Sequence, residues 1–244
     1  MNDALRVVAL SKSYARHAAV SDLSFSVRAG ELACLIGPNG AGKSTTMRIL
    51  GGLQLADSGH FSVAGERVES PARAKQLCGL TPQDVAMFDH LTGAETLALV
   101  GAIRAVPDAE RAADEWLRTF ELDAARHRLV RQYSGGMKRK LAVACAMLHR
   151  PPLVLLDESF VGLDPESTQA LQQALRRYCD EGGAVVLSSH ILDMVQTIAD
   201  RVIVMRAGQC VAEFDRAALD RRRAEGETVT SLYFALTRPD AHTA

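Results

Sequence analysis

The sequence predicts an α/β fold built on a sheet of mainly parallel strands, and three observations favour this fold class. Short apolar runs rich in Val, Leu and Ile recur along the chain, at 5–10, 32–36, 153–156, 184–187 and 202–205. Several of these runs are bounded by Gly, Pro or Asp, which is typical of strands. Segments of helical pattern lie between them, as expected where parallel strands are covered on both faces.

Composition and charge are those of an ordinary globular protein. The 244 residues are 48% hydrophobic and 23% charged, which suits one unit with a subdomain. A formal net charge of -1 gives no overall electrostatic reason to expect a nucleic acid partner. The longest apolar stretch, 141–148, is far shorter than the roughly 18 to 20 residues of a spanning helix, and the first residues lack a secretory-signal pattern. We expect a cytosolic chain without a membrane span.

The cysteines and histidines indicate neither disulfides nor a structural zinc site. The cysteines are odd in number and widely spaced, and we expect buried free thiols at Cys34, Cys78, Cys145, Cys179 and Cys210. The seven His residues form no cluster with Cys or carboxylates at metal-ligand spacing. Any metal is therefore expected to arrive with a ligand.

The run 32–36 leads into a phosphate-binding sequence. Residues 37–44 read Gly-Pro-Asn-Gly-Ala-Gly-Lys-Ser, which fits the pattern G-x-x-x-x-G-K-[ST] in its required place after a strand. The glycines let successive backbone N–H groups surround a phosphate, and the next helix directs its positive end at the same phosphate. Lys43 adds a charge near the β and γ oxygens, and Ser44 is expected to bind magnesium. A glycine-rich turn without a ligand would need neither residue.

The segment 91–148 predicts consecutive helices inserted into the core. Thr92 and Glu95 form a capping box, and Pro107 opens a second amphipathic stretch that runs through Trp116 and Phe120. A further helix is expected over 137–149, and it is apolar on nearly all sides from 141 to 148. That helix should be buried.

Three small residues precede this last helix. Ser134 is placed to cap it, and Gly135 and Gly136 keep its N-terminus free of side chains. The helix start is therefore a second candidate anion site, with a flexible turn as the alternative. One nucleotide rarely needs two such sites.

Two adjacent carboxylates end the strand at 153–156. An open parallel sheet presents its ligands at this end of its strands. Because neighbouring strand residues point to opposite faces, Asp157 and Glu158 are expected to differ in role. Asp157 would orient the magnesium shell, and Glu158 would face the water that attacks the γ-phosphate. The alternative is that both acids merely cap the next turn.

In their order along the chain, these motifs resemble those of the nucleotide-binding subunits of ABC transporters. The resemblance implies a P-loop NTPase (RecA-like) parallel-sheet core with an antiparallel β edge and a helical subdomain insert. It further implies one ABC ATPase domain over 1–244. Its parts are a catalytic α/β core at about 1–90 and 150–212, a helical signature subdomain at about 91–149, and a short tail at about 213–244.

The resemblance also implies ATP and Mg²⁺ as cofactors and assigns their contacts. Tyr14 matches the aromatic residue that stacks on adenine, Gln83 the glutamine that reaches the magnesium, and His190 the histidine that holds the γ-phosphate. The implied catalytic residues are Glu158, His190, Lys43 and Gln83, and the implied metal ligands are Ser44, Gln83 and Asp157. The implied nucleotide contacts are Tyr14, Gly37, Pro38, Asn39, Gly40, Ala41, Gly42, Lys43, Ser44 and Thr45, with Ser134, Gly135 and Gly136 acting in trans.

The same resemblance implies partners. The serine-glycine signature of one subunit would close over the ATP of another, giving a head-to-tail homodimer or heterodimer, with Asp164 in the contact loop. Separate transmembrane permease subunits would hold the chain at the cytoplasmic face of the inner (plasma) membrane. The sequence Tyr-Ser-Gly-Gly-Met-Lys at 133–138 and the short apolar patch at 232–236 resemble the branch that serves ABC-2-type exporters.

The sequence departs from the commonest family pattern at three positions. Tyr133 and Met137 flank the signature where leucine and glutamine are usual, and Ser159 follows Glu158 where proline is usual. None of these changes removes an acid, base or cation, so we expect hydrolysis. Met87, Phe88 and Leu91 either form a docking groove for a membrane partner or belong to the subdomain core.

Other function classes fit the sequence less well. A non-transport ATPase acting as a clamp on a macromolecule would carry a coiled-coil insert or two fused cassettes, and this chain shows neither heptads nor a basic excess. A P-loop GTPase would carry an Asn-Lys-x-Asp segment, which is absent. A small-molecule kinase leaves the signature before Met137 unexplained. A binding-only regulatory subunit would not need Glu158 and His190.

Overall fold

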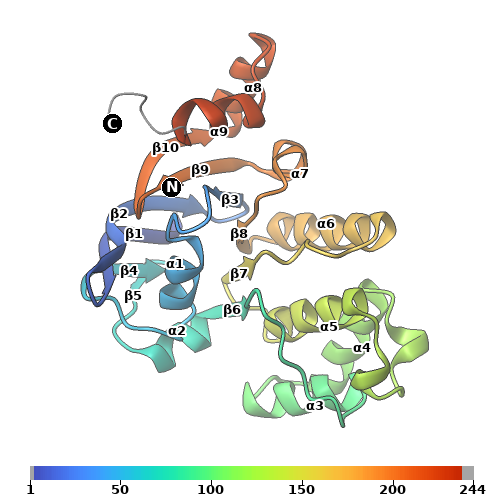
Figure 1. Ribbon diagram of the computed structural model, residues 1–244. Coiled ribbons are helices and arrows are strands. Elements are labelled where there is room, and N and C mark those ends of the chain that lie inside the picture. Colours follow the sequence, from blue (N-terminus) through green and yellow to red (C-terminus); the bar gives the residue numbers. More distant parts are fainter. Residues whose placement is uncertain (1–2, 238–244) are drawn as a thin grey trace.

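The larger of two sheets carries most of the predicted strands. The computed structural model describes residues 3–237, so the last residues of the predicted tail lie outside the described residues. Within that range the strand order of this sheet is β10-β9-β3-β8-β7-β6 (Figure 1). Its strands are β3 (Leu32–Ile36), β6 (Cys78–Thr81), β7 (Leu153–Asp157), β8 (Ala184–Ser188), β9 (Arg201–Arg206) and β10 (Gln209–Asp215). All neighbours pair in parallel except β10, which is antiparallel to β9.

A second sheet is wholly antiparallel and has the order β2-β1-β4-β5. Its strands are β1 (Asp3–Tyr14), β2 (His17–Arg28), β4 (Ser58–Val63) and β5 (Glu66–Arg67). The predicted run 5–10 lies in β1, and the other four predicted runs lie in the larger sheet. The predicted α/β class with a parallel core and antiparallel β structure is confirmed.

The central strand β3 is apolar throughout because it faces two cores. Leu32, Cys34 and Ile36 belong to a cluster that includes α5 (Gly135–Met147), α6 (Pro165–Asp180) and α7 (Leu192–Ile198). Ala33 and Leu35 belong to the other cluster, with α1 (Lys43–Leu50) and the antiparallel sheet. Alternate residues of a strand point to opposite faces, so a strand covered on both faces has no polar position.

The chain between β6 and β7 is helical, as predicted. It contains α3 (Gly93–Ile103), α4 (Ala109–Thr119), α5 and two short 3₁₀ segments, Asp123–Ala125 and Val130–Gln132. Thr92 and Glu95 form the predicted capping box at the start of α3. Trp116 stacks on Phe120 with ring centroids 5.7 Å apart. Figure 1 shows α3, α4 and α5 gathered on the side of the molecule away from the antiparallel sheet.

The helix predicted over 137–149 is α5, which begins earlier, at Gly135. Leu141 through Ala144, with Ala146 and Met147, are buried, as expected for a helix that is apolar on most sides. The cysteines Cys34, Cys78 and Cys179 are buried as predicted, whereas Cys145 and Cys210 are only half-buried, and all of these thiols are free.

The remaining helices lie at the periphery. They are α2 (Pro71–Leu77), α8 (Arg216–Ala224) and α9 (Val229–Thr237). The basic run Arg221–Arg223 lies exposed in the last turn of α8. Among residues 3–237, no helix has both the length and the apolar character needed to cross a bilayer.

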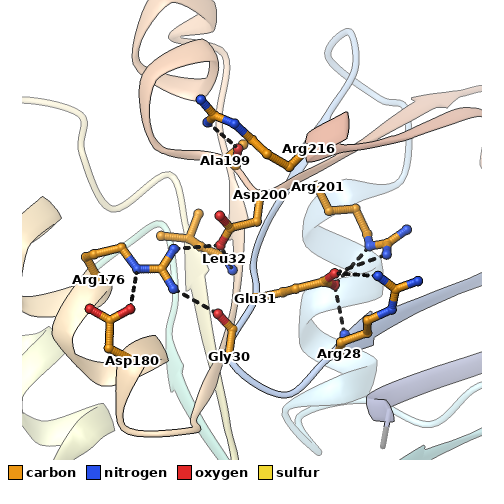
Figure 2. Close-up of polar contacts among 10 residues, drawn as sticks. All are labelled: Arg28, Gly30, Glu31, Leu32, Arg176, Asp180, Ala199, Asp200, Arg201 and Arg216. Carbon is orange, nitrogen blue, oxygen red and sulfur yellow. Dashed lines mark hydrogen bonds and ion pairs between the residues drawn. The ribbon is translucent and has the colours of Figure 1, made fainter. Parts of the chain in front are cut away.

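A network of ion pairs joins the strands at the sheet end opposite the phosphate loop (Figure 2). Arg201, at the start of β9, donates to Glu31 just before β3 and to Glu213 of β10. Arg176 of α6 donates to Asp200 and to the carbonyl of Gly30. The network therefore connects the strands at the end of the sheet that lies away from the phosphate loop.

Candidate active site

The phosphate loop connects β3 to α1 and depends on close backbone packing. Gly42 is the N-cap of α1, with φ 98°, and a Cβ there would lie 2.3 Å from the carbonyl oxygen of Ala19. A Cβ at Gly37 would lie equally close to the carbonyl oxygen of Met205. No side chain caps the start of α1. Its first amides therefore remain available to an anion.

Lys43 is held inside this loop. Its Nζ donates to the carbonyl oxygens of Gly37 at 2.6 Å and Pro38 at 3.1 Å. Burial lowers the pKa of Lys43, and the carboxylates of Glu158 and Asp157 oppose that shift. The ammonium group therefore donates to loop carbonyls in this structure. A bound phosphate would compete with these carbonyls for its hydrogen bonds.

A cavity of about 730 Å³ brings most of the predicted cis residues together, although Gly37, Pro38 and Asp157 are not among its lining residues. It is lined by Tyr14, Asn39, Gly40, Ala41, Gly42, Lys43, Ser44, Thr45, Gln83, Glu158 and His190. Residues His17, Ala19, Asp84, Arg139 and Val161 complete the lining, and sequence reasoning did not identify them. Tyr14 lies at the end of β1, 42% exposed, and its hydroxyl donates to Gln54.

Asp157 and Glu158 lie in different environments, and backbone geometry contributes to this difference in addition to strand alternation. Asp157 is the last residue of β7, is buried, and accepts a hydrogen bond from the hydroxyl of Ser188. Glu158 has φ 50°, which turns the chain away from β7. Its amide donates to Ser188 Oγ at 3.1 Å. Non-glycine residues held at positive φ are often found at functional sites.

Glu158 is paired with His190 within the cavity. Glu158 Oε2 lies 2.8 Å from His190 Nδ1, and their side chains are 11% and 63% exposed. An imidazole that donates from Nδ1 to this carboxylate leaves Nε2 for another partner. The pair thus combines a carboxylate shielded from solvent with an imidazole open to the cavity.

Ser134, Gly135 and Gly136 do not line this cavity. Ser134 caps α5 by accepting a hydrogen bond from the Met137 amide at 3.2 Å. A Cβ on Gly135 would meet nothing within 4 Å, and both Ser134 and Gly135 are exposed. The segment is an open helix start outside the first site, which is the placement expected of a contact made in trans.

The residues present fit a nucleoside triphosphate with a divalent cation. The uncapped amides of α1, with the Lys43 ammonium, are donors for phosphate oxygens. Ser44 and Gln83 offer oxygen ligands, the kind that Mg²⁺ prefers, and Asp157 lies behind the lining at the end of β7. Tyr14 provides an aromatic face at the rim.

The five lining residues that sequence reasoning did not identify carry weak sequence signals or none. Arg139 follows the signature by a few residues and Asp84 follows Gln83, so proximity to a motif was the only indication. His17 lies opposite Tyr14 across the β1–β2 hairpin, and Ala19 follows in β2. The sequence contains no strong turn signal that would have revealed this pairing.

Comparisons with known proteins agree on one family. The ABC transporter family model matches residues 20–161. The linearmycin resistance ATP-binding protein LnrL of Bacillus subtilis is 33% identical over 226 residues, covering 91% of this chain and 72% of LnrL. The doxorubicin resistance ATP-binding protein DrrA of Mycobacterium tuberculosis is 37% identical over 219 residues, covering 87% of this chain and 66% of DrrA.

A solved structure agrees with these relatives. A structure described as the ATP binding subunit of an ABC transporter has a TM-score of 0.87 and 32% identity. The match covers 96% of this chain and 99% of that chain.

Proposed function

The chain belongs to the ABC transporter family, and on that premise we propose that it is the ATP-binding and hydrolysing subunit that powers export through separate transmembrane subunits. The observation that carries this proposal is the cavity in which the phosphate loop faces the Glu158–His190 pair. Both relatives compared above are named for resistance to a compound, linearmycin or doxorubicin, which supports export. Nothing in these names favours a macromolecular clamp.

The proposed roles follow from the cavity. Bound Mg²⁺ would neutralise charge on the phosphates and orient them for in-line attack by water. Lys43 and the first amides of α1 would bind the phosphates, and Ser44, Gln83 and Asp157 would hold the metal. Glu158 would polarise the attacking water, while His190 would steady the γ-phosphate and orient Glu158. Catalysis would then rest on positioning and electrostatics.

The test of this chemistry is Glu158→Gln. We expect ATP hydrolysis to fall by about 10²-fold or more, since the amide cannot act as a base, with ATP binding retained. Measuring phosphate release alongside binding of a fluorescent ATP analogue separates the two effects. Glu110→Gln is the matched control, because Glu110 is exposed in the first turn of α4 and should leave both unchanged. Near wild-type hydrolysis in Glu158→Gln would contradict the assignment.

We also propose that two nucleotide-binding subunits close head to tail over two nucleotides. Ser134 and Gly135 are exposed, Gly136 is half-buried, and all three are absent from their own subunit's cavity, which supports a contact in trans. The partner subunit could be a second copy or a related chain. Asp164 caps α6 by accepting from the Ser167 amide at 2.8 Å, which orders the proposed contact loop.

Light scattering on Glu158→Gln checks the dimer. Slow hydrolysis should trap the closed state, so we expect a dimer with Mg-ATP and a monomer without it. Adding Ser134→Arg should abolish the dimer while preserving ATP binding, because the bulky arginine side chain would occupy the space that the partner's nucleotide must enter. A monomer under both conditions, despite bound ATP, would contradict closure by this chain alone.

Membrane attachment is the remaining part of the proposal. The membrane subunits would dock beside residues 83–99 and hold the chain at the cytoplasmic face of the plasma membrane. Phe88 is 54% exposed, which leaves it available to a partner, whereas Met87 packs against the main core and Leu91 is half-buried. With a helical signature subdomain at about 91–149, the docking surface at 83–99 would lie at the junction of the α/β core and that subdomain.

A further inference from the structure

Arg139 is a cation of the cavity to which the roles proposed above assign no function. It lies in α5, is half-buried, and lines the cavity with Gln83 and Glu158. Its Nη1 donates to the backbone carbonyl of Gln83 at 2.8 Å and to that of Pro82 at 3.4 Å. Both carbonyls belong to the loop that follows β6, so the guanidinium connects this loop to α5.

The chemistry of this contact suits a positioning role. A guanidinium stays protonated and presents its donors in a rigid planar fork. Burial lowers the pKa of Arg139, and the carboxylates of Asp84, Asp157 and Glu158 oppose that shift. The side chain is therefore a permanent cation that holds two backbone carbonyls while facing the acids of the site.

The helix that carries Arg139 also carries the exposed signature. Ser134 caps α5, and Arg139 lies close to this N-terminal end. Beyond Arg139 the helix is packed into the core from Lys140 to Ala144. A packed helix moves as a unit. A displacement of the Gln83 loop would therefore be transmitted through Arg139 to α5, and so to the signature at its start.

We propose that Arg139 is a positioning residue that fixes the Gln83 loop to α5. It thereby links Gln83, at the metal of this subunit's own nucleotide, to the signature that contacts the nucleotide of the partner subunit. This inference rests on the proposed function. Arg139 acts through the backbone of residues 82–83, so its contribution should depend on the metal rather than on the nucleotide alone.

The test compares Arg139→Met and Arg139→Lys in the full-length Glu158→Gln chain. Binding of a fluorescent ATP analogue is measured in Mg²⁺ and in EDTA. We expect Arg139→Met to weaken binding in Mg²⁺ by about tenfold, the size of one lost charged hydrogen bond, with little change in EDTA. Arg139→Lys should recover part of the loss, because it keeps the charge and one donor.

Hydrogen exchange gives a readout that does not depend on activity. In Arg139→Met we expect faster exchange at the amides of Gln83 and Asp84 and loss of any Mg-ATP-induced protection at 135–139. Arg111→Met is the control, since Arg111 is a cation of α4 that is 84% exposed and pairs with Asp108 at 3.2 Å, away from the Gln83 loop. Equal melting temperatures of the two variants would establish that both are folded.

Two results would overturn the inference. Equal weakening in Mg²⁺ and EDTA would make Arg139 a direct nucleotide contact, and no weakening in either would leave it without a role in the site. A Glu158→Gln parent that binds no ATP in either condition would instead contradict the proposed function. The two failures are therefore distinguishable.

Discussion

Tyr133, the residue before the signature serine, is anchored from two sides. Its hydroxyl donates to the carbonyl of Ala125 at 2.9 Å, and the side chain is 5% exposed. The backbone of Gly93 approaches so closely that a Cβ there would lie 2.2 Å from the Tyr133 oxygen. Tyrosine in place of the usual leucine is therefore accommodated by a glycine at the start of α3.

Gly93→Ala should destabilise the protein through this contact. Overpacking of a close-packed site costs about 1–3 kcal/mol, and we expect a loss in that range in urea unfolding. Adding Tyr133→Phe removes the clashing oxygen, so the double variant should lose less than the sum of the two singles. Gly135→Ala is the control, because its Cβ would meet nothing within 4 Å. Strict additivity would contradict the proposed fit.

At the scale of elements, the start of α3 is defined by side chains of its own sequence. Thr92 Oγ1 accepts from the Glu95 amide at 3.1 Å, and Glu95 Oε2 accepts from the Thr92 amide at 2.8 Å. Two helix-terminal donors are thereby satisfied reciprocally. Because α3 follows the Gln83 loop, this cap also determines where that loop ends.

Thr92→Ala should lower the free energy of unfolding by about 1 kcal/mol, since one capping acceptor is lost. Thr92→Ser keeps the hydroxyl and should retain most of the stability. Urea unfolding of the three proteins measures both effects. If serine were as destabilising as alanine, packing of the threonine methyl rather than capping would account for the loss.

At the scale of the whole molecule, the ion-pair network of Figure 2 connects elements far apart in the chain. Arg201 and Glu31 have side chains only 9% and 14% exposed, with Arg201 Nε 3.0 Å from Glu31 Oε2. Burial alone would raise the pKa of Glu31, but hydrogen bonds from Arg201 and the Arg28 amide outweigh it and lower that pKa. A lowered carboxyl pKa stabilises the fold above the unfolded-state value, and this stabilisation is lost as the pH falls through the folded-state value.

Arg201→Met should therefore be destabilising in a pH-dependent way. Near pH 7 we expect a loss of about 2 kcal/mol, because Glu31 would lose its charged hydrogen bonds from Arg201 and keep Arg28, 3.6 Å away, as its remaining cation. The difference from wild type should shrink as the pH falls below about 4.3, the ordinary value for a Glu carboxyl, because protonation of Glu31 removes the charge that Arg201 stabilises. Urea unfolding at several pH values measures this difference.

The control for this prediction is an exposed ion pair. Arg118 lies 3.8 Å from Asp114 with 68% of its side chain exposed. Arg118→Met should change stability by less than about 1 kcal/mol at any pH. A difference between wild type and Arg201→Met that stays constant with pH would assign the effect to lost packing of the arginine stem.

Much of the fold was predictable because its signals are local. The runs at 32–36, 153–156 and 184–187 are strands because residues buried on both faces are continuously apolar. Strands β2, β4, β5, β6 and β10 were not predicted. Strands β2, β4 and β10 each mix buried and exposed positions, and β5 and β6 are only 2 and 4 residues long. Their pairing depends on partners distant in the chain, which periodicity does not identify.

The sequence by itself determined the α/β class, the phosphate loop, the two carboxylates at the end of β7 and the helix caps at Thr92 and Ser134. Each is encoded in contiguous residues whose backbone preferences and hydrogen-bonding groups act locally. Only the tertiary structure decided that Gln83 is held by Arg139, that Glu158 meets His190, and that Ser134 lies outside its own subunit's cavity. These relations join segments that β6, β7, β8 and α5 bring together, and the pairing of strands distant in the chain sets their geometry.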